Sequence, residues 1–344
     1  MAATLSTLGS VTAIDAELES WSDLSSDGSW PTLLLGNGAS MNIWPAFGYD
    51  SLFEKATLSV SARHIFGPVG TNFETALEYI QHARVVLQAL RKPVDAVGAL
   101  YDEIRDSLFN VVNDAHMEWG LLSDECATVV ADALKFHSAV FTTNYDLLIY
   151  WSLMSGDRQH LQGTTDLFSG QDELRFNPGL FARTTFYYLH GAIHLWQDDD
   201  GVNGKWASRE GRSLRQIASQ YRPDSQIRPL FVSEGTSEEK LRTIRRSPYL
   251  SHCLNALTAD AGDIVVFGHS LSIQDKHIRD ALRVGHTAGR RIAFSVRPGG
   301  EAAVQRRKAE LYDQFRGLQP RFFDATTHPL GNPALAVDAP TADF

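Results

Sequence analysis

The sequence contains only two cysteines, Cys126 and Cys253, and each stands among apolar neighbours far from the other. This scarcity excludes a disulfide framework and a zinc site built on Cys-x-x-Cys pairs, and it fits a reducing compartment. Long apolar runs are also absent, since none approaches the ~18 residues that span a bilayer. The N-terminus has no basic flank before its weak apolar stretch, as a signal peptide would have. We therefore expect a cytoplasmic protein without a membrane partner.

An excess of positive charge is missing as well. The formal net charge is -10, and the lysines and arginines are scattered along the chain, which argues against direct binding of nucleic acid. The basic cluster Arg242, Arg245 and Arg246 follows Glu238 and Glu239 and is interpreted as a solvated helix face. With 43% hydrophobic and 21% charged residues, the composition is that of a globular protein that buries its own core.

What the sequence does contain is a series of short apolar runs bounded by turn or polar residues. Runs of this kind are typical of parallel strands buried on both faces, and we expect all of them to form one sheet. The segments between them show helical periodicity, so the sequence predicts an α/β fold with a Rossmann-like, doubly wound parallel sheet. The expected strands are residues 32–36, 139–146, 185–191, 229–235, 263–270 and 291–296.

A single sheet of this kind predicts one large domain over residues 31–325, preceded by an N-terminal extension over residues 1–30. Long helical patterns between the first two strands predict a helical insertion over residues 72–135. Residues 197–222 are polar and rich in glycine at their start, which predicts a polar insertion. Residues 326–344 are rich in alanine, proline and aspartate and are expected to form a loosely ordered tail.

In an open parallel sheet, ligands bind beyond the carboxyl ends of the strands, so polar residues that follow the apolar runs are the candidates for function. The first run continues as LLLGNGASMN. Gly36 and Gly38 allow backbone N–H groups to approach a phosphate, and Ser40 can add a hydroxyl donor at the next helix start. Met41 stands where the common dinucleotide fingerprint has a third glycine, and no P-loop is present. A plain strand-to-helix turn explains the same glycines.

The second candidate is the polar centre of FTTNYDLLIYW, residues 141–151. Asn144 and Asp146 stand two residues apart, so a continuing strand places both side chains on one side and Tyr145 on the other. An amide beside a carboxylate can hold a carboxamide and ribose hydroxyls. The alternative is an Asx-type turn that ends the strand.

The third candidate is YYLHGAIHLW, in which His190 follows an apolar run and precedes Gly191. An imidazole presented at such a bend has a reference pKa near ~6.5 and suits general-base catalysis. His194 stands four residues further on and raises a metal interpretation. Because nothing nearby supplies a third ligand, a structural histidine is the preferred interpretation of His194.

The fourth candidate is VVFGHSLSIQDKHI. Gly268 and Ser270 end the apolar run, and Ser270 suits contact with a phosphate or a ribose. Ser272 and Asp275 are expected to cap the following helix, which gives Asp275 a purely structural role.

Taken in order, these four segments resemble the sirtuin fold, in particular the sirtuin-like NAD hydrolases of bacterial antiviral defence. Sirtuins have a Gly-x-Gly-x-Ser loop, a strand ending in Thr-x-Asn-x-Asp, a catalytic His-Gly and a late Gly-x-Ser turn; this chain has GNGAS, TTNYD, LHG and GHSLS. The resemblance covers residues 32 to about 296. The chain departs from sirtuin deacylases because only Cys253 stands where they have a four-cysteine zinc module. It also has NIWPAFGYDSLFEKA in place of their Pro-Asp-Phe-Arg.

The resemblance implies an enzyme that cleaves NAD, bound as a substrate and without a metal, through an oxocarbenium-like transition state. The products would be nicotinamide and ADP-ribose. Asn144 would position the nicotinamide ribose and the attacking water, His190 would accept a proton, and Asp146 would hold the carboxamide. The residues expected to bind the diphosphate and adenosine side are Gly36, Gly38, Ser40, Gly268 and Ser270.

Three functions are compatible with these motifs. The first is NAD hydrolysis that depletes cellular NAD in antiviral defence, controlled by homo-oligomer formation or by a regulatory partner protein. The second is a sensor that binds NAD or ADP-ribose without turnover. The third is zinc-free, NAD-dependent protein deacylation, which would consume NAD only in the presence of an acylated peptide.

Overall fold

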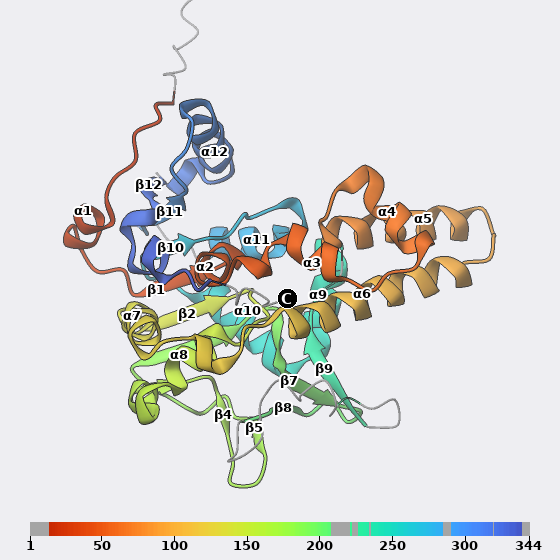
Figure 1. Ribbon diagram of the computed structural model, residues 1–344, viewed down its shortest axis with the longest axis horizontal. Helices are drawn as coiled ribbons and strands as arrows, with labels where there is room; N and C mark the ends of the chain where they lie inside the picture. The colour runs from red at the N-terminus through yellow and green to blue at the C-terminus, as the bar shows by residue number, and fades with distance from the viewer. Residues whose placement is uncertain are drawn as a thin grey trace, which may run out of the picture.

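The centre of the protein is a parallel sheet, shown in the computed structural model of Figure 1, which describes residues 14–207, 221, 226–233, 235–284, 290–318 and 320–338. The strand order is β12 (Arg321–Asp324), β11 (Ile292–Val296), β10 (Ile264–Phe267), β1 (Thr32–Leu35), β2 (Ala139–Thr142), β6 (Thr184–Tyr188) and β3 (Thr164–Thr165). All neighbouring strands in this order are parallel. Because β1 lies between β10 and β2, the strand order reverses at β1, as in doubly wound folds.

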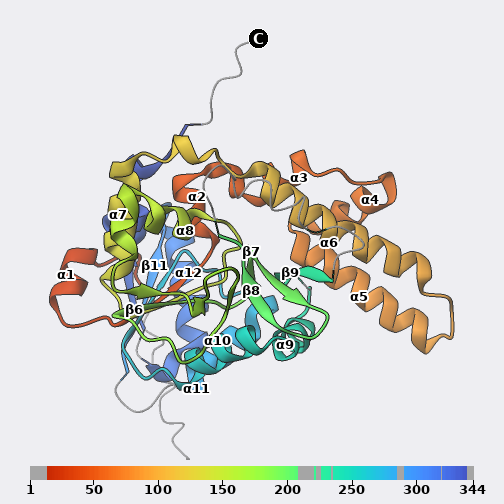
Figure 2. The same ribbon diagram turned by 90° about the horizontal axis from the view of Figure 1, so that it is seen from below.

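Helices cover both faces of this sheet. The α-helices in the described part of the chain, some of which lie away from the sheet, are α1 (Trp21–Ser26), α2 (Asn37–Ile43), α3 (Tyr49–Lys55), α4 (Val60–Val69), α5 (Phe73–Ala89), α6 (Asp95–Ala115), α7 (Asp124–Lys135), α8 (Leu148–Met154), α9 (Ser237–Arg246), α10 (Pro248–Ala259), α11 (Lys276–Val284) and α12 (Glu301–Gln314). Figure 2 shows α7 and α8 on one side of the sheet and α10 and α11 on the other. Every residue of β1 and β10 is buried, which explains their continuous apolar runs. The expected α/β architecture with a doubly wound parallel sheet is therefore confirmed.

A second, antiparallel sheet lies below the first in Figure 1. Its order is β4 (Phe168–Ser169), β5 (Leu174–Phe176), β8 (Asn203–Lys205), β7 (Gly191–Asp198) and β9 (Ile227–Phe231). Because β6 belongs to the first sheet and β7 to the second, His190 lies at the bend between the two sheets. The first part of the polar insertion expected over residues 197–222 belongs to the end of β7 and to β8. Residues 208–220 and 222 lie outside the described residues.

Two strands differ from the expectation that all apolar runs form one sheet. The run at 229–235 contributes to β9, which pairs antiparallel with β7, so its assignment to the parallel sheet is wrong. Pro229 gives a physical reason, because proline lacks the N–H that an interior strand donates and is confined to sheet edges. The parallel sheet ends instead at β12, a short run with Arg321 and Asp324 at its ends, which the apolar pattern did not reveal.

The helices α3–α6, residues 49–115, form an arm that projects from one side of the sheets (Figures 1 and 2). This differs from the helical insertion expected over residues 72–135. The arm begins earlier, and α7 packs on α8 and buries Ala127, Ala131 and Leu134, so α7 belongs to the body of the protein. In the described part of the chain, no helix combines the length and the apolar character needed to cross a bilayer.

The C-terminal segment is packed rather than loosely ordered as far as residue 338. Leu330 and Leu335 are buried and lie in short 3₁₀ turns. The expectation of a loose tail is therefore wrong for residues 326–338, because the few apolar side chains between the prolines enter the core. Residues 339–344 of the expected tail lie outside the described residues.

The later part of the expected N-terminal extension packs against β12. Glu19 forms an isolated parallel bridge with Phe323, and the ring of Trp21 lies 5.4 Å from that of Phe323. Residues 1–13 lie outside the described residues. Glu19 therefore extends the edge of the parallel sheet by one bridge, and α1 packs beside β12.

Two buried histidines, His137 and His328, make stability depend on pH. Burial lowers the pKa of His137 to about 4 and that of His328 to about 3, whereas both titrate near ~6.5 in the unfolded chain. Between these values the unfolded state binds more protons than the folded state. Each histidine is therefore expected to remove about 1.4 kcal/mol of unfolding free energy per pH unit as the pH falls from 6.5 towards 4.

Urea unfolding at pH 7.5, 5.5 and 4.5 measures this dependence. The His328→Gln variant is expected to be less stable at pH 7.5 but to lose stability more slowly on acidification, because it has no imidazole to protonate on unfolding. Equal slopes for the parent and the variant would contradict the buried neutral state of His328.

Candidate functional site

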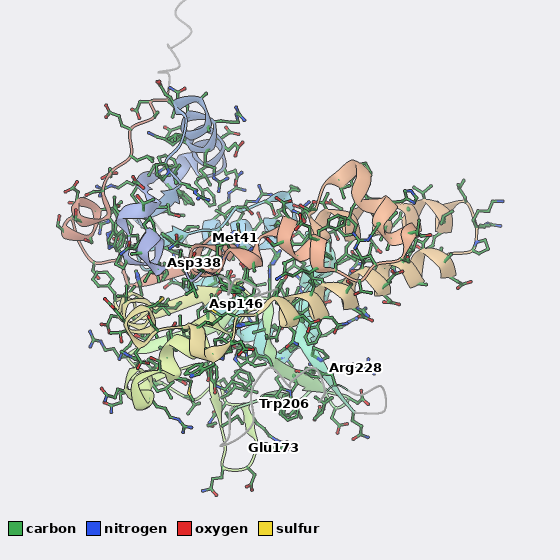
Figure 3. All side chains as sticks on the ribbon, viewed as in Figure 1. Met41, Asp146, Glu173, Trp206, Arg228 and Asp338 are labelled. Atoms are coloured by element: carbon green, nitrogen blue, oxygen red, sulfur yellow. The ribbon has the colours of Figure 1, made fainter. Side chains whose placement is uncertain are left out.

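A cavity of about 640 Å³ lies at the carboxyl ends of β1, β2, β6, β10 and β11, where the arm meets the sheet. Figure 3 labels Met41 and Asp146, which both line this cavity. Of the eight residues predicted from the sequence, seven line the cavity and Ser40 does not. The seven are Gly36, Gly38, Asn144, Asp146, His190, Gly268 and Ser270.

Close packing of two loops accounts for the glycines. The N–H of Gly36 donates to the carbonyl of Phe267 (3.0 Å), and the N–H of Gly38 donates to the carbonyl of Gly268 (2.8 Å). A Cβ atom on Gly36 would lie 2.5 Å from the Cα of His269, and one on Gly38 would lie 2.8 Å from the Cα of Gly268. Gly268 has φ of +65°, in the left-handed region that favours glycine. Packing of the β1–α2 turn on the loop after β10 thus requires these glycines, and their contact with a phosphate stays a prediction.

Ser40 joins Asn144 and Asp146 in a buried network. Its hydroxyl donates to Asp146 Oδ2 (2.6 Å) and accepts from Asn144 Nδ2 (2.8 Å). The other carboxylate oxygen of Asp146 accepts the N–H of Leu148 (2.8 Å) at the start of α8, in the manner of an Asx-type turn. Burial raises the pKa of Asp146, although these hydrogen bonds oppose the shift. Ser40 therefore fixes the two predicted side chains, which differs from its expected contact with a diphosphate.

The amide oxygen of Asn144 is buried and forms no hydrogen bond to a described residue. The single hydroxyl hydrogen of Ser40 goes to Asp146, so Ser40 must accept from the amide nitrogen of Asn144, which sets the orientation of that amide. A buried carbonyl oxygen without a donor costs about 1–3 kcal/mol. Because Asn144 lines the cavity, a hydroxyl group of a ligand or a water molecule is the natural donor.

His190 is paired with a second histidine, His277, at the start of α11. Their Nε2 atoms lie 2.9 Å apart, and Nδ1 of His277 lies 3.0 Å from Ser237 Oγ, which also accepts the backbone N–H of His277 (2.9 Å). One imidazole must donate and the other accept, so the proton positions on the two rings are linked. Burial and then the Lys240 cation lower the pKa of His190 well below its usual value, and burial lowers that of His277 to about 4. Both rings are neutral at pH 7.

A fully buried lysine lies behind this pair. The ammonium of Lys240, on α9, donates to Glu74 Oε1 of the arm (2.8 Å) and to Asp275 Oδ1 (2.9 Å). Asp275 Oδ1 also lies 3.9 Å from His190 Nε2. The Asp275 carboxylate therefore contacts Lys240 and lines the cavity. Among the described residues no backbone N–H donates to it, and the N–H of His277 goes to Ser237 instead, so the expected helix cap is wrong.

The charges of this cluster stabilise one another against the cost of burial. Burial alone would lower the pKa of Lys240, but Glu74 and Asp275 hold it above its usual value. Burial alone would raise the pKa of Asp275, but Lys240 and the nearby imidazoles hold it far below its usual range. The pKa of Glu74 is raised because its burial outweighs the attraction of Lys240. Lys240 thus pairs with both carboxylates, and Asp275 is the one whose charged form the cluster favours.

His190, Asp275 and His277 also form a group that could hold a metal ion, since one ligand atom of each lies within 4.8 Å of the others. The Lys240 ammonium opposes this use, because it lies 2.9 Å from the Asp275 oxygen and would repel a divalent cation beside it. A hydrogen bond between the imidazoles accounts for their close approach. His194 stands apart from this group and is fully buried in β7 among aromatic rings, as a structural histidine would be.

The sequence did not reveal Glu74, Ser237, Lys240 or His277 as members of the site. Lys240 follows Glu238 and Glu239 on a helix that was interpreted as solvated, and only its tertiary contacts show that it is buried. The sequence gives only a weak indication of His277, which stands two residues after Asp275 in the candidate segment VVFGHSLSIQDKHI.

The fold and the cavity define a Rossmann-like α/β protein with a ligand-sized cavity at the carboxyl edge of its sheet. Residues 33–330 match the family model described as a domain of unknown function, DUF4917. The chain therefore belongs to the DUF4917 family, and the matched range contains every site residue described above. No curated protein matches the sequence.

Proposed function

We propose that the protein is an NAD glycohydrolase, which cleaves NAD into nicotinamide and ADP-ribose. The observation that supports this most is that the groups along the cavity follow the order of the strands. His190 and Asn144 follow the neighbouring strands β6 and β2, whereas the glycine loops at Gly36 and Gly268 follow β1 and β10. The reactive groups therefore lie at one end, and the glycine loops that the sirtuin-like resemblance assigns to the diphosphate lie next to them.

The proposed reaction breaks the bond between nicotinamide and C1 of the ribose, with positive charge developing on the ribose, and water then adds to C1. The unpaired amide oxygen of Asn144 would accept a hydrogen bond from the ribose or from this water. His190 would take the proton that the water loses, at Nδ1, while its Nε2–H donates to His277. The product hydroxyl at C1 then completes ADP-ribose.

Leu108 and Val112 of the arm, together with Phe47 just before it, supply an apolar wall to the same cavity. The nicotinamide ring is a cation when attached to the ribose and is neutral after it leaves. Apolar surroundings disfavour the charged form relative to the neutral form, so this wall would favour departure of the ring. Asp146 would accept an N–H of the carboxamide and keep the ring oriented.

Purified protein incubated with NAD tests the proposal. We expect equal amounts of nicotinamide and ADP-ribose by chromatography, and a rate about 100-fold lower for Asn144→Ala, which removes the acceptor at the reacting ribose. Asn110→Ala is the matched control, because Asn110 is exposed on α6 and does not line the cavity.

Two other outcomes would replace this proposal. NAD that binds in calorimetry but stays intact would indicate a sensor, and nicotinamide release that requires an acylated peptide would indicate deacylation. The proposed biological role, depletion of NAD in antiviral defence, requires control of the activity by self-association or by a partner protein. Comparing the growth of cells that express the parent with the growth of cells that express the Asn144→Ala variant measures the effect of the activity on viability.

A further inference from the structure

The cavity continues past the glycine loops to the end of β11. Ser295 and Arg297 at that strand end and Arg307 on α12 all line it, and Figure 1 shows α12 beside β11 and β12. In strand order, β11 lies on the far side of β10 from β2 and β6. A dinucleotide whose nicotinamide lies near His190 would therefore place its adenosine ribose near β11.

This end of the cavity is cationic. Arg297 is exposed, and it forms no ion pair with a carboxylate of the described residues. The guanidinium of Arg307 is held in place, since it donates to the carbonyls of His269 (3.1 Å) and Ser270 (2.9 Å). Its carboxylate neighbour, Glu310, lies 3.5 Å away and is about half exposed, so solvent weakens that pair.

The carboxylates that line the cavity, Glu74, Asp146 and Asp275, form no ion pair with Arg297 or Arg307. Glu74 and Asp275 contact Lys240, and Asp146 accepts from Ser40. These carboxylates therefore have partners of their own and do not neutralise the two arginines near the end of β11.

The start of α12 borders this end of the cavity. Gly300 is the N-cap of the 14-residue helix α12 and provides no side-chain hydrogen bond, and Ala303 in the first turn lines the cavity. Backbone N–H groups at a helix N-terminus attract an anion as the two arginines do, and the exposed carboxylate of Glu301 in the first turn opposes part of this attraction.

We propose that this end of the cavity binds a phosphate on the 2′-oxygen of the adenosine ribose, so that the preferred dinucleotide is NADP. The inference rests on the proposed function for the nature of the dinucleotide. In dinucleotide-binding sheets, a carboxylate at the neighbouring strand end selects a free 2′-hydroxyl, and an arginine accommodates a 2′-phosphate. Here that position carries Ser295 and Arg297. Guanidinium groups bind phosphate with paired, charge-assisted hydrogen bonds.

Ser295 is suited to the same task. Its Oγ accepts the N–H of Gly268 (2.9 Å), which fixes the hydroxyl beside the glycine loop. The hydroxyl hydrogen has no acceptor that the structure describes, so it can be donated to the phosphate or to the ribose.

Calorimetry with ADP-ribose and 2′-phospho-ADP-ribose tests this inference without turnover, because neither contains the bond that the proposed reaction breaks. We expect the phosphorylated ligand to bind about 10- to 100-fold more tightly, the range that charge-assisted hydrogen bonds to one phosphate provide. Arg297→Ala is expected to abolish this preference and to leave the affinity for ADP-ribose within about twofold. Arg306→Ala is the matched control, because Arg306 is exposed on α12 and does not line the cavity.

Equal affinity for the two ligands, or a preference that persists in Arg297→Ala, would overturn the inference. A comparison of adenosine 2′,5′-bisphosphate with the 3′,5′ isomer tests the position of the phosphate, and tighter binding of the 3′,5′ isomer would also overturn it. The test of the proposed function, which is cleavage of the dinucleotide, is independent of this test of ligand preference. Preference for 2′-phospho-ADP-ribose without cleavage of NAD or NADP would keep the phosphate site and remove the glycohydrolase, whereas cleavage with equal affinities would do the reverse.

Discussion

Replacing His190 with alanine is expected to lower the rate of nicotinamide release about 100- to 10,000-fold, the range that a positioned general base contributes. The ring lines the cavity, and in the tautomer that donates its Nε2–H to His277 (2.9 Å) the other ring nitrogen, Nδ1, would receive the proton. Because burial and Lys240 hold the pKa of His190 well below 6.5, the ring stays unprotonated at pH 7. The rate of the parent should therefore not fall as the pH drops from 8 to 6.5, and the acid limb of its profile should lie lower.

The design needs a control for folding, because His190 is buried. His190→Gln keeps a side chain of similar size that cannot act as a base, and its rate is expected to fall as far as that of His190→Ala. His64→Ala, on an exposed position of α4, should retain the parent rate. Full activity in a folded His190 variant, or an acid limb centred at pH 6.5 or above, would refute the assignment of His190 as the base.

Replacing Lys240 with methionine is expected to lower the free energy of unfolding by about 3–5 kcal/mol, the cost of leaving a buried charge without its partner. Asp275 would keep its burial and lose the ammonium at 2.9 Å that lowers its pKa. Glu74 would lose the same hydrogen-bond donor. Urea unfolding at pH 7.5 measures the effect. Lys276→Met, which removes an exposed lysine paired with Asp280, should change stability by less than about 0.5 kcal/mol.

A double variant separates the lost charge pairing from lost packing. Lys240→Met combined with Asp275→Asn removes one of the two carboxylates that contacted the ammonium and leaves only Glu74 without its donor, so part of the stability should return. A loss of less than about 1 kcal/mol in Lys240→Met alone would show that water reaches the site and that the ion pair is not buried.

The sequence was sufficient for the central strands and for most of the cavity wall. Strands β1 and β10 are covered on both faces, so their positions appear as continuous apolar runs. The residues after them fall at the same sheet edge in any parallel sheet, which is why Asn144 and His190 could be placed together before the structure was known. The same reasoning gave a wrong prediction for β9, because an apolar run does not indicate which sheet the strand joins.

The supporting cluster could not be predicted, because it depends on contacts between distant parts of the chain. Lys240 and Glu74 form a hydrogen bond although they are 166 residues apart in the sequence. Neither has a local sequence feature that indicates burial. The proximity of Arg297 and Arg307 likewise becomes apparent only in the folded structure, where α12 lies beside the end of β11. Sequence patterns report the environment of a strand or a helix face, whereas these side chains depend on how separate elements pack.

The position of Lys240 has a consequence for communication within the molecule. Its ammonium links the first turn of α5 in the arm, through Glu74, to Asp275 at the edge of the sheet. Movement of the arm away from the body would separate Glu74 from Lys240 and change the electric field at His190, which lies 3.9 Å from Asp275. A molecule that displaced the arm from the body would thus alter the basicity of this imidazole without touching it, through the contacts of Lys240.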